Sequence, residues 1–446
     1  MLRKNYVRLS DSLAAVCLVV GLLATGPFAS ALDRFVGPNG SDSNTGLTRS
    51  RPWKTLVHAF GRLDPGDTLR ILPGTYVLRN EPGHIDGRAV IHRLGGITIQ
   101  GNNSAWTIIR PLVPGTVNIT GHIVFQGSYI RLQDLNITGD GQSNEPGILG
   151  FDAHHIDVYD CEVKNCRGGG INFAHSDSLR IVGNSTHDNA FENPAQHSGI
   201  SIYQPIRWPD AENRRWNIFI GRNYSYDNYN RVPGPLGITD GNGIILDDSE
   251  YTQVGSLSAA QLQRIGSATR YPGRTLIEGN MCNYNGGSGI QIHYSAGAVV
   301  KNNTCVGNRQ FAFLSNGDYL NQGQVALTHA SDNHVLNNVL VSTAVVYADD
   351  FGGAPYAASD YDGGTNLWEA NLLFTKVRGS LLTDNRAALN KSIRRNPLFA
   401  DEAANDYRSI AGRGLGLPWA RHIYTDILGT RVLSNGRNDL GCIQNP

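Results

Sequence analysis

The chain has 446 residues, and its 38 lysines and arginines balance its 38 aspartates and glutamates, so the formal net charge is zero. This balance excludes bulk electrostatic attraction to nucleic acid or anionic lipid, and any charged substrate would have to be held by local charges. The 52 glycines favour many tight turns between short strands over long helices.

Residues 1–31 have the pattern of a secretory signal peptide. The basic start MLRKNYVR precedes an apolar run from Leu13 to Leu23, and Ala29-Ser30-Ala31 provides a cleavage site. The run is shorter than the about 20 apolar residues that span a membrane. We therefore expect cleavage near Ala31 and a soluble protein that is secreted or periplasmic, without membrane insertion.

The next recognisable element is an amphipathic helix in WKTLVHAFGRL. Leu56, Phe60 and Leu63 follow each other at helical spacing, which gives this segment one apolar face. We expect the helix to cap the first coil of the domain that follows, because an open end would expose core and strand edges.

A repeat occupies the middle of the chain. Four segments carry two asparagines five residues apart after a β-rich run: LRIVGNSTHDN, IFIGRNYSYDN, TLIEGNMCNYN and AVVKNNTCVGN. The spacing from Asn280 to Asn303 is 23 residues. Short strands at this period predict a parallel β-helix, because propeller blades need about 40–50 residues. Stacked asparagines would hydrogen-bond along the axis.

Cysteines fit the same repeat. Cys161 and Cys166 take the two asparagine positions in IDVYDCEVKNC. Cys282 and Cys305 are expected in an inward stack of small side chains, where adjacent coils would also permit a disulfide.

Each repeat continues into a second strand that is entered through glycine, and the four strands are GGINFAH, SGISIYQ, NGIILDD and SGIQIHY. Alternation places two apolar rows inside, which are Ile171, Ile200, Ile244 and Ile290, then Phe173, Ile202, Leu246 and Ile292. The outward row is Ala174, Tyr203, Asp247 and His293, and the corner row is His175, Gln204, Asp248 and Tyr294. Because coils lie about 4.8 Å apart, Tyr203, Asp247 and His293 should be close together.

Three insertions, after Gln204, Asn228 and Asp248, flank this row. Repeat proteins commonly place insertions on the binding face. Aromatic rings stack on sugars and arginine binds carboxylates, so the sequence predicts a groove for an acidic polysaccharide. The inserted residues of interest are Arg207, Trp208, Arg214, Arg215, Trp216, Tyr229, Arg231, Arg264, Arg270 and Tyr271. From these and their neighbours we select Arg207, Trp208, Arg231, Tyr294 and His197 as substrate-binding candidates.

The opening segment FVGPNGSDSNTG with RPWKTLVHAFGRLDPGDTLRILPGTY resembles the start of secreted bacterial proteins of the pectate-lyase-like superfamily, and NPLFADEAANDYR and DLGCIQNP resemble their closing coils. The resemblance implies an all-β, right-handed parallel β-helix with an N-terminal capping helix. It implies a single domain over 32–446, with the cap and first coil in 35–76 and closing coils in 390–446. We expect a monomer.

Part of the site is similar to family 9 pectate lyases. YDNYNRVPGPLGITDGNGI resembles their first acidic motif, which implies calcium binding at Asp240, with Asp248 as a second candidate ligand. Gly287 and Ser288 replace the acidic pair of that family, and Ile245 stands where its base lysine is expected. Thr239-Asp240-Gly241 and Asp247-Asp248 also resemble polygalacturonase motifs, although both lie in one strand and RIK is missing.

The leading hypothesis is a lyase that cleaves a uronic-acid polysaccharide by β-elimination. His293 or Tyr203 would be the base or acid, Asp247 would orient it, and Asp240 would bind calcium or the sugar. A glycoside hydrolase that uses Asp240, Asp247 and Asp248 is the first alternative, and a C5-epimerase is another. A carbohydrate-binding surface protein without activity also fits, because a fold does not fix a function.

Overall fold

The computed structural model of the protein describes residues 32–82, 88–92, 105–209, 215–347, 353–362, 365–384, 389–402, 406–417 and 439–443. The predicted signal peptide and Arg214 lie outside these residues. The chain from Ala31 to Pro446 forms one compact unit. In the described part of this unit, no helix combines the length and apolar character needed to cross a membrane.

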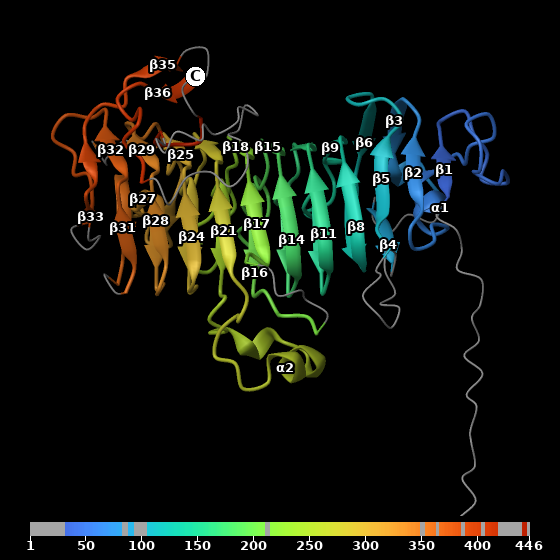
Figure 1. The fold of residues 1–446 in the computed structure, drawn as a ribbon, viewed down its shortest axis with the longest axis horizontal. Helices are drawn as coiled ribbons and strands as arrows, with labels where there is room; N and C mark the ends of the chain where they lie inside the picture. The colour runs from blue at the N-terminus through green and yellow to red at the C-terminus, as the bar shows by residue number, and fades with distance from the viewer. Residues whose placement is uncertain are drawn as a thin grey trace, which may run out of the picture. The chain divides into compact units, whose positions relative to one another are not determined.

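Three parallel sheets form the sides of a continuous coil (Figure 1). The twelve-stranded sheet contains β1 (Asp33–Val36), β2 (Thr68–Ile71), β5 (Thr107–Pro111), β8 (Ser128–Gln133), β11 (His154–Tyr159), β14 (Asp177–Val182), β17 (Ile218–Gly221), β21 (Thr275–Glu278), β24 (Ala298–Lys301), β28 (His334–Leu336), β31 (Leu367–Glu369) and β33 (Leu389–Asn390). The eleven-stranded sheet contains β3 (Gly74–Val77), β6 (Val117–Thr120), β9 (Asn136–Thr138), β12 (Glu162–Lys164), β15 (Ser185–His187), β18 (Tyr224–Tyr226), β22 (Met281–Asn283), β25 (Thr304–Val306), β29 (Val339–Ser342), β32 (Leu372–Thr375) and β34 (Ile393–Arg394). The nine-stranded sheet contains β4 (Arg88–His92), β7 (His122–Gln126), β10 (Ile148–Phe151), β13 (Ile171–Ala174), β16 (Ile200–Tyr203), β20 (Ile244–Asp247), β23 (Ile290–His293), β27 (Gly323–Thr328) and β30 (Tyr356–Asp360).

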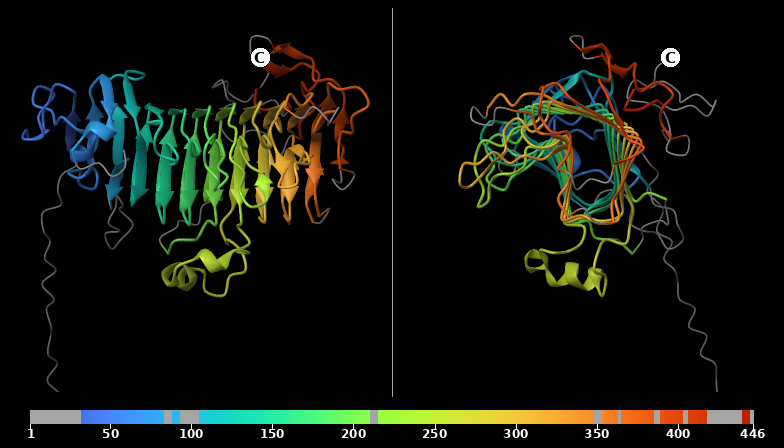
Figure 2. Two further views of the ribbon diagram at one scale, coloured as in Figure 1. Left: turned by 180° about the vertical axis from the view of Figure 1, so that it is seen from behind. Right: turned by 90° about the vertical axis from the view of Figure 1, so that its left-hand side faces the viewer.

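Nine successive coils contribute one strand to each sheet, as β14, β15 and β16 do before β17 begins the next coil, and the coils at the two ends contribute to fewer sheets. The view along the stack shows the sheets enclosing a common interior (Figure 2, right). The predicted all-β parallel β-helix is therefore confirmed. Elements outside the three sheets are α1 (Leu56–Phe60), η1 (Leu78–Asn80), η2 (Val254–Ser256), α2 (Ala259–Ile265), the pair β19 (Gly237–Ile238) and β26 (Phe313–Leu314), and the pair β35 (Phe399–Asp401) and β36 (Asp406–Ser409).

The interior is the apolar core that the alternation predicts. Seven of the eight residues expected inside on the glycine-entered strands are completely buried, and Phe173 is 1% exposed. They belong to one hydrophobic cluster that runs through the stacked coils. Burying these side chains supplies the main stabilisation, because apolar area removed from water contributes about 25 cal/mol per Å².

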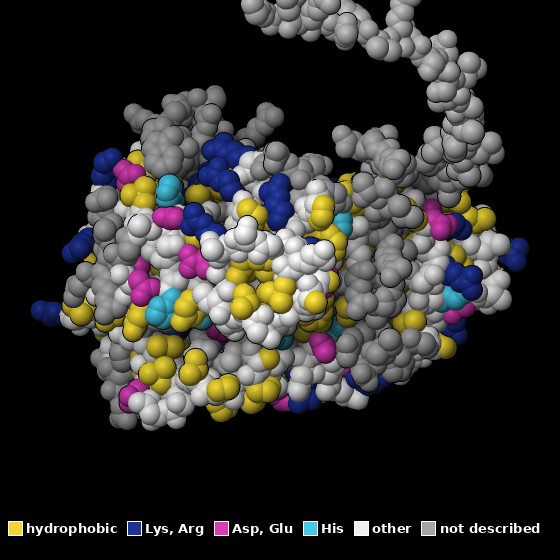
Figure 3. All heavy atoms as spheres, turned by 90° about the horizontal axis from the view of Figure 1, so that it is seen from below, with side chains coloured by type: hydrophobic (Ala, Val, Ile, Leu, Met, Phe, Trp, Pro, Cys, Tyr) yellow, Lys and Arg dark blue, Asp and Glu magenta, His cyan; other side chains and the backbone are white. Residues whose placement is uncertain are grey.

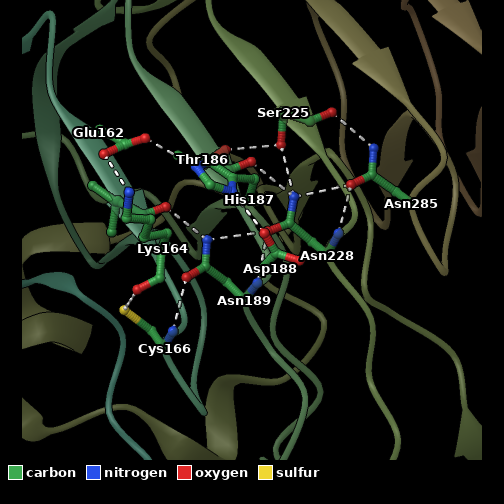
Figure 4. Close-up of polar contacts among 11 residues, drawn as sticks. Glu162, Lys164, Cys166, Thr186, His187, Asp188, Asn189, Ser225, Asn228 and Asn285 are labelled. Carbon is green, nitrogen blue, oxygen red and sulfur yellow. Dashed lines mark hydrogen bonds and ion pairs between the residues drawn. The ribbon is translucent and has the colours of Figure 1, made fainter. Parts of the chain in front are cut away.

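Two asparagine ladders run along the stack, as the repeat predicts. In the first, each side-chain amide donates to the next asparagine at 2.9–3.0 Å, through Asn184, Asn223, Asn280, Asn303, Asn338 and Asn371. In the second, the amides of Asn189, Asn228 and Asn285 donate in the same way at 2.8–3.1 Å, and the ladder ends at Asn308; Figure 4 shows its first three residues. The ladders also satisfy backbone groups that the tight corners would leave buried and unpaired.

The cysteines have the expected places in this repeat. The backbone amides of Cys161 and Cys166 donate to the first asparagine of each ladder at 3.0 Å. Cys282 and Cys305 are directly opposite on β22 and β25 and are completely buried. Their thiols are free, so these residues form the inward stack without a disulfide.

The predicted capping helix is present but shorter than the sequence suggests. The side chain of Thr55 caps the start of α1 by accepting a hydrogen bond from the His58 amide at 3.2 Å. Leu56 and Phe60 are completely buried, and Gly61 follows the last helical residue. Leu63 is buried from the following loop. Figure 1 shows α1 beside β1, at the start of the stack.

Candidate active site

The outward row on the nine-stranded sheet has the predicted register. Tyr203 on β16 pairs with Asp247 on β20, and Asp247 pairs with His293 on β23. Nδ1 of His293 lies 2.8 Å from Oδ1 of Asp247. Stacked coils therefore bring a phenol, a carboxylate and an imidazole side by side, as the sequence predicts.

This row forms part of the floor of a cleft with a volume of about 640 Å³. The floor is the outward face of β10, β13, β16, β20 and β23, and it includes Leu149, Phe151, Asn172, Ala174, Ser201, Tyr203, Ile245, Asp247 and His293. Residues 194–197 and 234–240 supply one wall, and Gln253 from the segment that carries α2 lies on the other side. In the view along the stack, loops project on one side and the α2 segment from a neighbouring corner (Figure 2, right).

The first wall is fixed by backbone pairing. The loop before Asp240 contains β19, which pairs antiparallel with β26 from a later coil. The amide of Thr239 donates to the Gln196 side chain at 3.0 Å, and the amide of Gly241 donates to the His197 carbonyl at 2.9 Å. These contacts tie together two loops from successive coils and place Asp240 over the end of the sheet floor.

Asp240 is a carboxyl group whose surroundings disfavour its charged form. Burial and, to a smaller extent, the negative charge of Asp247 raise its pKa, which is about 7 once the opposing contributions are included. His293, Arg309 and a hydrogen bond with Asn242 oppose this rise. At neutral pH the Asp240 carboxyl is therefore protonated in a large fraction of the molecules, which suits a general acid.

The surroundings of His293, in contrast to those of Asp240, favour its charged form. Burial alone would lower its pKa, but the hydrogen bond with Asp247 and the charge of that carboxylate outweigh burial, so the net pKa is raised. Asp240 and Asp248 add smaller contributions in the same direction. His293 therefore favours the imidazolium form beside the Asp247 carboxylate. The cleft thus holds two carboxyl groups in different surroundings: those of Asp240 favour its protonated form, and Asp247 is paired with an imidazole.

His197 also lines the cleft, as the sequence predicts for a substrate-binding residue. Its Nδ1 lies 3.2 Å from the backbone amide of Gly169, which can only donate, so Nδ1 accepts and Nε2 carries the proton. Burial lowers the pKa of His197 to about 4. His197 is therefore a neutral hydrogen-bond donor at physiological pH.

The surroundings of Asp248 do not suit the metal role predicted for it. Asp248 is completely buried at a corner, where one carboxylate oxygen accepts from the amide and hydroxyl of Thr252 at 2.6 and 2.7 Å. The other oxygen accepts from Gln204 at 2.7 Å and from the Gln253 amide at 3.0 Å. Four protein donors thus occupy the lone pairs that a cation would need.

The donor set around Asp240 does not fit calcium either. Calcium takes six to eight oxygen ligands, several of them carboxylates. Across the described ranges, no group of three or more His, Cys, Asp or Glu residues is arranged to hold a metal ion. Gly287 lies against the backbone of Asp240 and Ser288 follows it in the chain, so neither position supplies an acidic ligand. Asp240 faces the positive charges of His293 and Arg309 instead.

Four of the predicted substrate-binding residues lie outside the cleft lining: Arg207, Trp208, Arg231 and Tyr294. Trp208 stacks on His154 with ring centroids 4.3 Å apart, and Arg264 covers its ring at 4.2 Å. Tyr294 stacks on His329 at 4.6 Å. Figure 3 looks onto the face that carries α2 and shows Lys and Arg side chains gathered on one side of that segment. The inserted arginines that the structure describes therefore lie outside the cleft lining.

Arg309 is a site residue that the sequence interpretation missed. It is completely buried, and its Nε donates to the Leu320 carbonyl at 3.0 Å. Its Nη1 lies 3.4 Å from both the Thr239 carbonyl and the Ser288 hydroxyl, while its Nη2 has no hydrogen-bond partner among the described residues. Burial lowers its pKa to about 10, and the charge of Asp240 opposes this change.

A signal for Arg309 exists in the repeat. It directly follows the ladder residue Asn308, at a corner where earlier coils carry Ala190, Tyr229 and Gly286. A permanently charged side chain in a row of small or aromatic residues is unusual enough to mark a functional position.

No family model matches the chain. A curated protein of Bacillus subtilis (strain 168), the uncharacterized protein YwoF, is 24% identical over 143 residues, which are 30% of this chain and 29% of that protein. The chain therefore spans less than a third of that relative's length.

Several solved structures are similar to this chain at low identity. A pectate lyase, Pel9A, is 12% identical, with 94% of this chain and 98% of that chain covered and a TM-score of 0.49. A glycoside hydrolase is 10% identical, with 81% and 96% covered and a TM-score of 0.49. A rhamnogalacturonan lyase is 15% identical, with 75% and 87% covered and a TM-score of 0.41. None of these likenesses decides the reaction.

Proposed function

We propose that the protein is a carbohydrate-active enzyme, exported from the cytoplasm, that hydrolyses a glycosidic bond with Asp240 and Asp247. The observation that carries this proposal is that both carboxyl groups line one cleft in opposite surroundings. Asp247 pairs with the imidazole of His293 at 2.8 Å, whereas burial favours the protonated form of Asp240. Glycoside hydrolases need such a pair, one acid and one carboxylate.

The different surroundings of Asp240 and Asp247 suggest a different catalytic role for each. Asp240 donates its proton to the glycosidic oxygen as the bond to the leaving sugar breaks. Asp247 is held in place by His293 and takes the proton of the water that attacks the sugar. Tyr203 lies directly beside Asp247 in the row, where its phenol is placed to hydrogen-bond a sugar hydroxyl.

The charge of the cleft favours a neutral sugar at the site of cleavage. Its lining includes Glu145, Asp240 and Asp247 together with His197 and His293, and among the described lining residues there is no lysine or arginine. A uronate carboxylate would meet acidic groups there. β-Elimination beside a uronate needs a cation at that carboxylate to stabilise the developing negative charge. The cleft therefore supports hydrolysis of a neutral glycan better than the expected cleavage of an acidic polysaccharide.

β-Elimination remains a second candidate because of one feature. Tyr203, Asp247 and His293 form an unbroken row, and a tyrosine or histidine in such a row is a suitable base for a C5 proton. In that case Arg309, behind Asp240, would supply part of the positive charge. Calcium, which the sequence resemblance implies, would need ligands beyond Asp240.

Product analysis on neutral and uronic-acid polysaccharides tests the proposal. Hydrolysis releases reducing ends without ultraviolet absorbance, whereas β-elimination releases an unsaturated product that absorbs. We expect reducing ends only, lost in Asp240→Asn and Asp247→Asn and retained in Asp318→Asn, an exposed matched control outside the cleft lining. Absorbing product that disappears in Tyr203→Phe would instead establish the lyase. Glycan binding without any cleavage would establish a binding protein.

A further inference from the structure

The row of Tyr203, Asp247 and His293 continues toward the start of the stack with a small residue and then an aromatic residue. Residues directly opposite on β10, β13 and β16 are Phe151, Ala174 and Tyr203. Phe151 is 45% exposed and lines the cleft. Because adjacent coils lie about 4.8 Å apart, the backbones of Phe151 and Tyr203 are about 9.6 Å apart. The methyl side chain of Ala174 leaves the space between the two rings open above the sheet.

The floor beneath this gap is polar and incompletely hydrogen-bonded. Asn172 and Ser201 are the outward residues two positions before Ala174 and Tyr203, and both line the cleft. They are 8% and 9% exposed, and neither Oδ1 of Asn172 nor Oγ of Ser201 has a hydrogen-bond partner among the described residues. A buried polar atom without a partner costs free energy, and this cost is relieved when a ligand supplies the missing donor. Because both residues line the cleft, a sugar bound there is within reach of these side chains.

The opposite wall adds an apolar surface. Leu236 lines the same cleft and is 74% exposed. A sugar ring presents C–H groups on its faces and hydroxyl groups around its edge, so it suits aromatic and aliphatic walls together with a polar floor.

We infer that the space over Ala174, between Phe151 and Tyr203, is a subsite for one neutral sugar ring of a bound glycan. Phe151 and Leu236 contact the faces of this ring, while Asn172 and Ser201 bind its hydroxyl groups. The adjoining position along the row is Asp247, so the subsite holds the sugar next to the bond that is cleaved. The position of the subsite next to the cleaved bond rests on the proposed function. Binding of the sugar ring does not, because binding is measurable without cleavage.

Filling the gap tests the subsite. Wild-type protein is screened against neutral oligosaccharides of two to six residues, namely fragments of β-glucan, xylan, mannan, galactan, arabinan and chitin, and affinities are measured by calorimetry for those that bind. We expect Ala174→Leu to weaken binding at least tenfold, because the larger side chain occupies the sugar position. Phe151→Ala, a change at an exposed ring, should weaken it to a similar extent. Ala260→Leu, the same change on the exposed α2 helix, should leave it within twofold.

The outcomes separate the subsite from the reaction. Loss of binding in Ala174→Leu and Phe151→Ala without any detectable hydrolysis by wild-type protein supports the subsite and overturns the proposed function. Wild-type affinity in both variants overturns the subsite, whatever the enzyme cleaves. Binding of acidic glycans alone, or of no neutral oligosaccharide in the panel, also overturns it. Circular dichroism confirms that each variant is folded, and Phe151→Ala gives the decisive result if Ala174→Leu is not.

Discussion

Asp247 and His293 face each other from adjacent coils, with Oδ1 and Nδ1 2.8 Å apart, and the charges of both shift the pKa of nearby Asp240. The pKa values of Asp240 and His293 therefore both depend on the charge of Asp247. Protonation of His293 stabilises the Asp247 carboxylate, and the same carboxylate helps to keep the proton on Asp240. One acid and one base can thus coexist near neutral pH in a small cleft.

Activity should depend on the proton of Asp240. Because its pKa is about 7, the acid form is lost as the pH rises through that value, and kcat/KM should fall on the alkaline side near pH 7. Asp240→Asn should lose about 10²–10⁴-fold in rate at the optimum. Steady-state kinetics from pH 5 to 9, with a glycan that the wild-type protein cleaves, measure the pH dependence of kcat/KM and the loss of rate in Asp240→Asn. A pH profile that stays flat through pH 8 would contradict the role of Asp240 as general acid.

The same substitution should stabilise the fold. The pKa of Asp240 is raised in the folded state, so the native protein binds its proton more tightly than the unfolded chain and loses stability as the pH rises from about 4 to about 7. Asparagine carries no charge and removes this cost, which is at most about 4 kcal/mol. Denaturant unfolding at pH 5 and pH 8 should show Asp240→Asn gaining more stability at pH 8. An equal change at both values would show that the cause is not ionisation.

Arg309 should set the pH at which Asp240 loses its proton. Its positive charge opposes the rise in the pKa of Asp240, so Arg309→Gln should raise that pKa and move the alkaline limb of activity upward by roughly one pH unit. Arg309→Lys keeps the charge and should leave the limb near its original position. The pH at which activity falls on the alkaline side can be measured even if both variants are less stable. The same pH in wild type and in Arg309→Gln would exclude an effect of the Arg309 charge on the pKa of Asp240.

Asp248 should matter for stability and not for metal binding. Asp248→Ala leaves the donors of Thr252, Gln204 and the Gln253 amide without their acceptor, and we expect a loss of about 2–4 kcal/mol in the free energy of unfolding. Chelator treatment of wild-type protein should change neither activity nor melting temperature. A chelator-dependent drop in melting temperature that is absent in Asp248→Ala would restore the metal interpretation.

The ladders should resist substitution far more than surface asparagines. Asn228 donates to Asn285 and to the Thr186 carbonyl and accepts from Asn189, all in the buried interior. Asn228→Ala removes these bonds and should cost about 2–5 kcal/mol. Asn316, an exposed asparagine, provides the matched control, and its substitution by alanine should change stability by less than about 0.5 kcal/mol. Similar losses in the two variants would refute the structural role of the ladder.

Much of this architecture is readable from single residues. Glycine-entered strands with isoleucine at alternate positions specify which side chains enter the core, because the side-chain period of a strand is two. The asparagine spacing specifies how one coil sits on the next. Together these two patterns predict that Tyr203, Asp247 and His293 form one row. The same alternation also points Asn172 and Ser201 outward, although nothing in their neighbourhood distinguishes them from ordinary surface residues.

The β-helix, its core and the register of the outward row can therefore be predicted from sequence alone, because these depend on a local period repeated along the chain. Which loop side chains reach the cleft is apparent only from the folded structure. The course of an insertion depends on its pairing with distant segments, as β19 with β26, and on stacking partners such as His154 for Trp208. For that reason the inserted arginines that the structure describes lie outside the cleft lining, and Arg309 from a later coil opposes the rise in the pKa of Asp240.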